Sequence, residues 1–274
     1  MTSVTLTPGT GARPLADMLT MLRRNLLRAM RYPGLTSFTI AIPIVLLLLF
    51  VFVFGGAVGA GVAPGVDPGA AGRAAYLDYI TPAILLFGVI GAAQSVAITA
   101  AMDATSGIMA RFRTMAISSA SVLGGPVLGT VVQGLIAVTV VLGLAVALGY
   151  RPSAGGLGWL ALAGLFALVT FAFSWLCVAM GLAARSVETA SNTPMLLTAL
   201  PFLGSGFVPV ETMPAGVRWF AEYQPLTPII ETTRSLLAGT PPAASTTLLT
   251  LGWTVLVAVL GLAWSRSLYR RERR

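Results

Sequence analysis

Long uncharged runs of apolar residues dominate the chain and alternate with short segments that carry arginine. Six runs, each at least 22 residues long, cover 32–66, 79–102, 114–150, 152–184, 189–210 and 235–265. A helix needs roughly 20 apolar residues to cross the hydrocarbon core of a bilayer. The pattern therefore predicts an all-α membrane protein whose six transmembrane helices lie at about 35–58, 79–101, 119–148, 157–183, 190–208 and 247–265.

The fifth predicted span is the least regular of the six. It contains Pro194, Pro201 and Pro209 together with Gly204 and Gly206. Proline removes a backbone donor, but neighbouring helices can satisfy the freed backbone groups inside a membrane. We expect this segment to be either a kinked span or a re-entrant one.

Residues 14–32 have the period of an amphipathic helix. One stripe holds Leu15, Met18, Leu19, Leu22, Leu26 and Met30. The opposite face holds Asp17, Arg24, Arg28 and Arg31. A helix with an apolar stripe and a cationic face is typical of the membrane interface, here the cytoplasmic one. The alternative is a simple topology anchor that has no protein partner.

A second short helix is predicted in the loop 102–118, where Asp103 or Ser106 can act as its cap. Its apolar face consists of Ile108, Phe112 and Met115, with Met109 and Ala116 beside them and Arg111 and Arg113 at the flanks. A helix this apolar, in a loop that faces water, must be covered by something. Either the lipid headgroup region or a cytoplasmic protein could cover it.

The segment 209–240 is too apolar for an open loop and too often interrupted by charge and proline to span the membrane. We predict short outer re-entrant helices that dip into the interface, with Trp219 and Tyr223 at the level of the headgroups. An ordinary structured loop is the alternative.

Composition and charge support the membrane prediction. Charged residues make up 9% of the chain, against about 25% in soluble domains. All 17 basic residues are arginine. With the N-terminus inside, 13 of them are cytoplasmic and four lie outside, at Arg73, Arg151, Arg218 and Arg234. This positive-inside bias predicts that both termini are cytoplasmic, and it accounts for the net charge of +8 without nucleic-acid binding. The abundance of Ala, Gly and Arg without Lys suggests a high-GC bacterial genome, so we expect a multi-pass protein of the bacterial inner (plasma) membrane.

Several kinds of chemistry lack the residues they need. The chain has no His and no Lys, and its single cysteine is Cys177, so we expect no catalytic residue, metal or cofactor on it. The string GGPVLGT at 124–130 has the glycine spacing of a phosphate loop but not its lysine. Gly125 and Gly129 instead form a small-residue face for close helix packing. No acidic residue lies within a predicted span, which argues against an ion-coupled carrier.

Two strings resemble the permeases of ABC-2 type exporters, and within them the daunorubicin-resistance permease group. GIMARFRTMAISSASVLGGPVLG at 107–129 is similar to the group's cytoplasmic loop and the start of its third span. FVPVETMPAGVRWFAEYQPLTPIIETTRSLLAG at 207–239 is similar to its outer segment, including the Met213-Pro214 pair. Two positions depart from the group: its members often carry an acidic residue where Ala110 stands and a proline where Ala116 stands. Without the acidic residue, this chain lacks one polar contact to the ATPase that the resemblance would imply.

The resemblance implies the ABC-2, or type V exporter, fold. Residues 1–33 would form the cytoplasmic N-terminus with the connecting helix, 34–266 the six-span domain and 267–274 a basic tail. A coupling helix at about 103–117 would fit a groove of a separate nucleotide-binding subunit, with the N-terminal helix alongside. Its contact residues would be Gly107, Ile108, Met109, Arg111, Phe112 and Arg113.

The same resemblance implies a homodimer with two copies of the ATPase subunit, which would bind the ATP and Mg. A hydrophobic or amphipathic compound, such as an antibiotic or a lipid, would leave the cell along the dimer interface. Residues from spans two and five would line this path: Phe87, Gln94, Asn192, Met195, Thr198 and Phe202. Ordinary helix packing is the alternative for each of them. An ion-coupled carrier or channel acting without an ATPase, or a scaffold subunit, is the alternative for the chain.

Overall fold

The computed structural model describes residues 14–31, 33–62, 69–108 and 119–271, and every element in these ranges is helical. The long helices are α1 (Pro14–Arg31), α2 (Pro33–Leu49), α4 (Ala70–Thr105), α6 (Ser119–Ala147), α7 (Gly156–Ala183) and α11 (Ala244–Arg271). The short elements are the π-helix η1 (Phe50–Phe54), α3 (Gly55–Val62), α8 (Val187–Asn192), the 3₁₀ helices η2 (Thr193–Thr198), η3 (Leu200–Leu203) and η4 (Val210–Thr212), α9 (Ala215–Tyr223) and α10 (Leu226–Leu237). The prediction of an all-α protein is confirmed for these residues.

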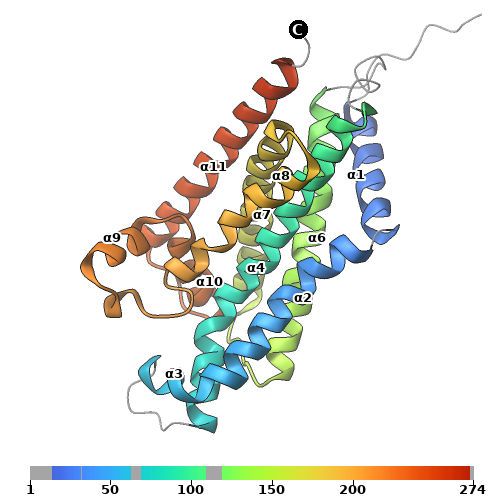
Figure 1. The fold of residues 1–274 in the computed structure, drawn as a ribbon. Coiled ribbons are helices and arrows are strands. Elements are labelled where there is room, and N and C mark those ends of the chain that lie inside the picture. Colours follow the sequence, from blue (N-terminus) through green and yellow to red (C-terminus); the bar gives the residue numbers. More distant parts are fainter. Residues whose placement is uncertain (1–13, 32, 63–68, 109–118, 272–274) are drawn as a thin grey trace, which may run out of the picture.

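Five helices in the described part of the chain are long and apolar enough to cross a membrane. They cover residues 37–59, 70–105, 120–147, 156–183 and 244–270. These five overlap the first four predicted spans and the last one. They run side by side as a bundle, with α1 and the last turns of α11 at the same end (Figure 1). We call this the terminal end of the bundle.

Helix α4 is the central element of the bundle. Every residue from 80 to 90 is buried, so the helix is apolar all round and is covered by α2, α6 and α7. The approach of α7 is close because Gly181 lies against the backbone of Ala97, where a side chain would collide. With 36 residues, α4 is about 54 Å long, whereas the hydrocarbon core of a bilayer is about 30 Å thick. Its ends therefore extend beyond the hydrocarbon.

The outward faces of the peripheral helices are apolar. Val255, Val259 and Leu260 of α11 and Ile136 of α6 are exposed large side chains. A surface of this kind is stable against lipid and not against water. The exposed faces thus agree with the membrane assignment that the composition suggested.

The predicted fifth span, 190–208, is not one continuous helix. The chain there passes from α8 into η2 and then η3, with Pro194 and Pro201 in the first turns of the two 3₁₀ helices. Proline cannot donate to the preceding turn, and each of these prolines starts a new short helix instead of continuing the old one. The segment packs along α4 and α7.

The segment 209–240 forms η4, α9 and α10. Helix α10 is buried against α4, α7 and α11, with Ile229, Ile230 and Leu237 fully covered. Helix α9 instead exposes Trp219 and Tyr223, whose rings lie 6.0 Å apart. Their placement at headgroup level remains a prediction.

Candidate functional site

Helix α1 packs against α6 through the small-residue face that the sequence indicated. A side-chain carbon at Gly125 would collide with Met21, and one at Gly129 would collide with Asn25. The Oδ1 atom of Asn25 also accepts a hydrogen bond of 2.8 Å from Nε2 of Gln133 on α6. The glycines therefore serve close packing, and their partner is the amphipathic N-terminal helix.

The apolar stripe of α1 is divided between two environments. Met18 approaches Gly124, but Met21 and Asn25, which lie outside the predicted stripe, make the closest contacts with α6. Leu15, Leu19 and Met30 are 79%, 64% and 79% exposed. One flank of α1 thus contacts protein, while the rest of the stripe remains free to contact lipid.

The polar face of α1 is tied to the last turn of α4 by two ion pairs. Arg24 Nη2 donates to Asp103 Oδ1 at 3.0 Å, and Arg28 Nη1 donates to the same oxygen at 3.1 Å. Arg28 Nη2 also lies 3.4 Å from the sulfur of Met102. Asp103 lies inside α4, which continues to Thr105, so its carboxylate pairs with α1 and does not cap a new helix. We call these three residues, Arg24, Arg28 and Asp103, the Asp103 clamp.

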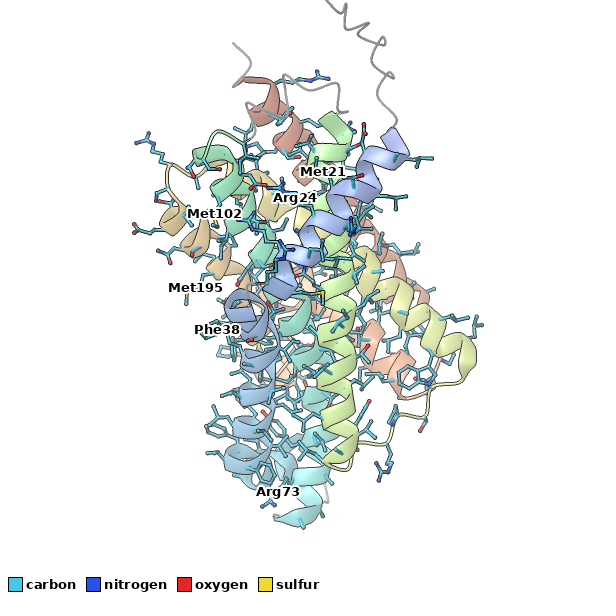
Figure 2. The ribbon with its side chains drawn as sticks, turned by 90° about the vertical axis from the view of Figure 1, so that its right-hand side faces the viewer. Met21, Arg24, Phe38, Arg73, Met102 and Met195 are labelled. Atoms are coloured by element: carbon cyan, nitrogen blue, oxygen red, sulfur yellow. The ribbon has the colours of Figure 1, made fainter. Side chains whose placement is uncertain are left out.

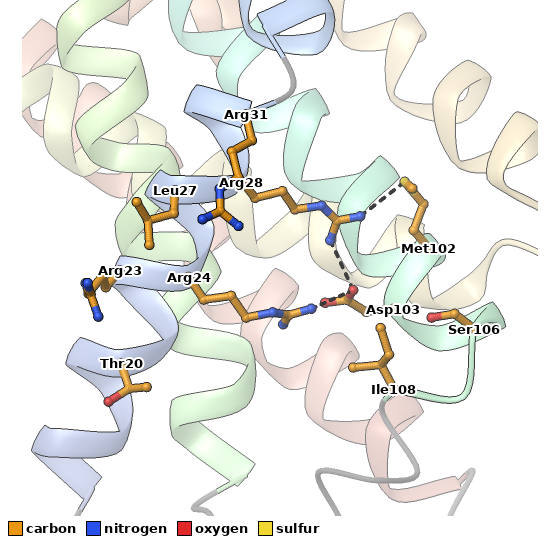
Figure 3. A pocket seen from close by; sticks show the side chains of 10 residues that line it. All are labelled: Thr20, Arg23, Arg24, Leu27, Arg28, Arg31, Met102, Asp103, Ser106 and Ile108. Carbon is orange, nitrogen blue, oxygen red and sulfur yellow. Dashed lines mark hydrogen bonds and ion pairs between the residues drawn. The ribbon is translucent and has the colours of Figure 1, made fainter.

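A cavity of about 680 Å³ lies between α1 and the end of α4, around the clamp (Figure 3). We call it the arginine cavity. Its lining residues are Thr20, Arg23, Arg24, Leu27, Arg28, Arg31, Met102, Asp103, Ser106 and Ile108. Figure 2 places Met21 and Arg24 of α1 and Met102 of α4 at the terminal end of the bundle, and Arg73 at the opposite end.

The predicted coupling helix begins directly beside this cavity. Gly107 follows α4 with φ of +73°, a conformation that favours glycine, and turns the chain away from the helix. Ile108 then lines the cavity. The remaining predicted contact residues, Met109, Arg111, Phe112 and Arg113, lie outside the described residues.

The structure brings together part of the predicted substrate path. Gln94 Nε2 donates to the carbonyl oxygen of Pro194 at 2.9 Å, which joins α4 to η2. The rings of Phe87 and Phe202 meet edge to face at 5.3 Å. Asn192 and Met195 are exposed. The hydroxyl of Thr198 donates to the carbonyl of Met195 within its own helix, so its hydrogen bond is local.

Two aromatic residues that the sequence analysis did not select complete this region. The ring of Phe207 stacks on Phe202 at 4.5 Å and lies 4.6 Å from the ring of Phe50. Phe50 opens the π-helix η1, an irregular turn of a kind often found at functional sites. The repeated phenylalanines of FVFVF were visible in the sequence, but their contact with residues some 150 positions away was not.

Near the opposite end of the bundle, Arg234 of α10 fixes the loop that follows η3. Its Nη2 donates to the carbonyl of Ser205 at 3.0 Å, its Nη1 to Glu231 at 2.6 Å, and its guanidinium lies 4.2 Å from the ring centre of Tyr79. The hydroxyl of Tyr79 donates to the same Ser205 carbonyl at 2.9 Å. The sequence analysis counted Arg234 among the four arginines predicted to lie outside and assigned it no contact.

Groups that could perform metal chemistry are sparse. The described ranges hold no cluster of three or more His, Cys, Asp or Glu side chains that could bind a metal ion. Cys177 is buried within α7. The clamp, the arginine cavity and the phenylalanine contacts point to contacts between surfaces and to the passage or binding of a ligand.

Comparison with known proteins agrees with these features. The chain is 28% identical to the daunorubicin resistance ABC transporter permease protein DrrB1 of Streptomyces coeruleorubidus over 232 residues, which cover 84% of this chain and 77% of the relative. It is 25% identical to the probable doxorubicin resistance ABC transporter permease protein DrrC of Mycobacterium tuberculosis over 181 residues, which cover 66% and 65% of the two chains. The ABC-2 type transporter family itself matches residues 16–238. The predicted resemblance is confirmed, and the chain belongs to the ABC-2 type transporter family of integral membrane permeases.

Proposed function

We propose that this chain is the membrane subunit of an ATP-driven exporter of hydrophobic or amphipathic compounds, such as an antibiotic or a lipid. The family match carries the proposal, and relatives whose names refer to daunorubicin and doxorubicin resistance support the substrate class. Because the chain has no lysine for a phosphate loop, a separate nucleotide-binding subunit binds the ATP and Mg. The assembly contains two copies of each chain.

In this proposal the chain crosses a bacterial inner membrane six times, with both termini in the cytoplasm. The fifth of these crossings, in addition to the five long helices, is the interrupted segment 187–203. Its six α-helical and ten 3₁₀-helical residues extend about 29 Å when laid end to end, close to the thickness of the hydrocarbon core. The segment is long enough because a 3₁₀ helix rises further per residue than an α-helix.

The Asp103 clamp supports a route for coupling. The segment predicted to contact the ATPase follows the clamp within a few residues, and the clamp joins the end of α4 to α1. Helix α1 is in turn packed against the glycines of α6. When the ATPase dimer closes and displaces the coupling helix, α1 and α6 move together as one packed unit, and the clamp links this unit to α4. This motion switches the permease between inward-open and outward-open states.

The substrate passes between the two copies, along α4 and the segment 187–203. In the cluster of Phe50, Phe87, Phe202 and Phe207, Phe202 presents an exposed ring that packs on the buried rings of Phe87 and Phe207, and Gln94 and Asn192 offer amides. Exposed Met195 adds an adaptable apolar contact. Such a lining suits flat lipophilic molecules, which bind mainly through apolar contacts and a few polar groups.

The experiment that tests the function uses the full chain co-expressed with its ATPase. Phe112→Asp and Arg111→Glu are expected to abolish both co-purification and drug-stimulated ATP turnover, because they place negative charge at positions predicted to form the apolar face and the cationic flank of the coupling helix. Arg185→Glu is the control, since Arg185 is exposed at the end of α7 and outside that helix. Full coupling in both variants would refute the coupling assignment. Gradient-driven transport by the chain alone in liposomes would refute the ATP-driven mechanism.

A further inference from the structure

The residues that line the arginine cavity carry a net positive charge. Four of its ten lining residues are arginine and one, Asp103, is acidic, which leaves a formal charge of +3. Asp103 pairs with Arg24 and Arg28. Arg23 and Arg31 are exposed, and no carboxylate of the described ranges pairs with either of them.

The spacing of these arginines along α1 makes their positive charges repel one another. Arg24 and Arg28 are four residues apart on α1, and Arg28 and Arg31 are three apart, so each pair lies on one face of the helix. Like charges at these spacings destabilise a helix. An anion in the cavity would remove this repulsion and could accept forked hydrogen bonds from several guanidinium groups, a geometry that suits phosphate.

The cavity also has an apolar side. Leu27, Met102 and Ile108 line it together with the arginines. The neighbouring face of α1 exposes Leu15, Leu19 and Met30. A ligand that matches the whole surface therefore combines an anionic group with hydrocarbon, which a soluble phosphate ion does not.

The position of the cavity relative to the bilayer agrees with such a ligand. The cavity lies at the C-terminal end of α4, and α4 is longer than the hydrocarbon core is thick. Its guanidinium groups are therefore placed near the headgroup layer, while the exposed leucines of α1 reach the acyl chains. Basic pockets beside transmembrane helices bind the headgroups of anionic lipids by this arrangement.

We propose that the arginine cavity is a binding site for an anionic phospholipid, whose headgroup phosphate pairs with Arg23 and Arg31 and whose acyl chain follows Leu27 and the exposed stripe of α1. The bound lipid holds α1 against the end of α4, beside the Asp103 clamp. This site is separate from the substrate path and does not depend on the transport assignment.

The test measures binding of phosphatidylglycerol to the purified full chain in neutral detergent by native mass spectrometry, with phosphatidylcholine as the reference lipid. The variant is the double substitution Arg23→Gln and Arg31→Gln. An arginine near a membrane surface contributes enough that losing two weakens binding by roughly 30-fold. The matched control is Arg185→Gln with Arg266→Gln, because both residues are exposed at the terminal end and outside the cavity. The control should bind phosphatidylglycerol as the unmodified chain does.

Three results would overturn the proposal. Equal loss in the variant and its control would mean that diffuse surface charge, not the cavity, attracts the lipid. Saturation of the site by inorganic phosphate at the concentration that suffices for the lipid would make the ligand a soluble anion. Unchanged lipid binding in the variant, combined with lost co-purification of the ATPase, would mean that an acidic segment of that subunit occupies the cavity.

Discussion

Replacing Asp103 by asparagine removes the carboxylate that pairs α4 with two arginines of α1. Asparagine keeps the shape of the side chain and one acceptor oxygen but loses the charge that Arg24 and Arg28 share. The two arginines then lose the negative charge that Asp103 placed between them. We expect α1 to bind less tightly to the bundle.

The magnitude follows from the burial of the three side chains. Hydrogen bonds to charged groups contribute about 1.5–3 kcal/mol each when buried, and exposed ion pairs contribute at most about 1 kcal/mol. The Asp103 side chain is 9% exposed, but Arg24 and Arg28 are 36% and 24% exposed, so solvent screens both pairs. We therefore assign about 1 kcal/mol to each pair, or about 2 kcal/mol in total. A loss of this size lowers the melting temperature by about 4–8 °C.

The assay is thermal unfolding of the full chain in detergent, with Asp78→Asn as the control. Asp78 is an exposed residue of the same helix, and none of the ion pairs among the described residues includes it. A double-mutant cycle with Arg28→Gln isolates the pairwise energy, for which we expect about 1 kcal/mol. If the Asp103→Asn variant has the same melting temperature as the unmodified chain, or if the cycle gives no coupling energy, the clamp does not hold α1 in place.

Two further predictions concern other contacts of the bundle. Gly125→Val inserts a branched side chain where Met21 already lies, and we expect the free energy of unfolding to fall by about 1–3 kcal/mol. Gly143→Val, whose side chain would enter open space, should leave this free energy unchanged in the same assay. Arg234→Gln removes one of the two donors to the Ser205 carbonyl, together with the pair to Glu231, and should lower the free energy of unfolding by about 1–3 kcal/mol and speed proteolysis near Ser205. The exposed Arg218→Gln should change this free energy by less than about 1 kcal/mol. Equal melting temperatures within either pair would contradict the corresponding contact.

The sequence was most informative where a property depends on local composition. Run length located five long apolar helices, because crossing a bilayer imposes a minimum number of apolar residues. The glycine face at Gly125 and Gly129 was recognisable as a packing surface, since small residues at this spacing allow close approach. What it packs against could not be deduced, because α1 is about 100 residues away in the chain.

Properties that depend on helix register and on distant neighbours were not predictable in this way. Asp103 looked like a cap because the apolar run ends at residue 102, but α4 continues to Thr105 and turns the carboxylate toward α1. The contacts of Phe50 with Phe207, and of Arg234 with Ser205, likewise join separate elements. Periodicity within one segment contains no information about such pairs.

The contacts of α1 have a consequence for how motion could travel through the bundle. One flank of α1 is packed against the glycines of α6, and another is held to α4 by ion pairs. Packing without voids transmits displacement rigidly, whereas a screened ion pair can break and re-form at small cost. Helix α1 should therefore move together with α6, while its ion pairs with α4 break and re-form. In that case the charge around Asp103, including any lipid phosphate beside it, determines how readily the inward-open and outward-open states interconvert. The close packing at Gly125 and Gly129 determines whether α6 follows the motion of α1.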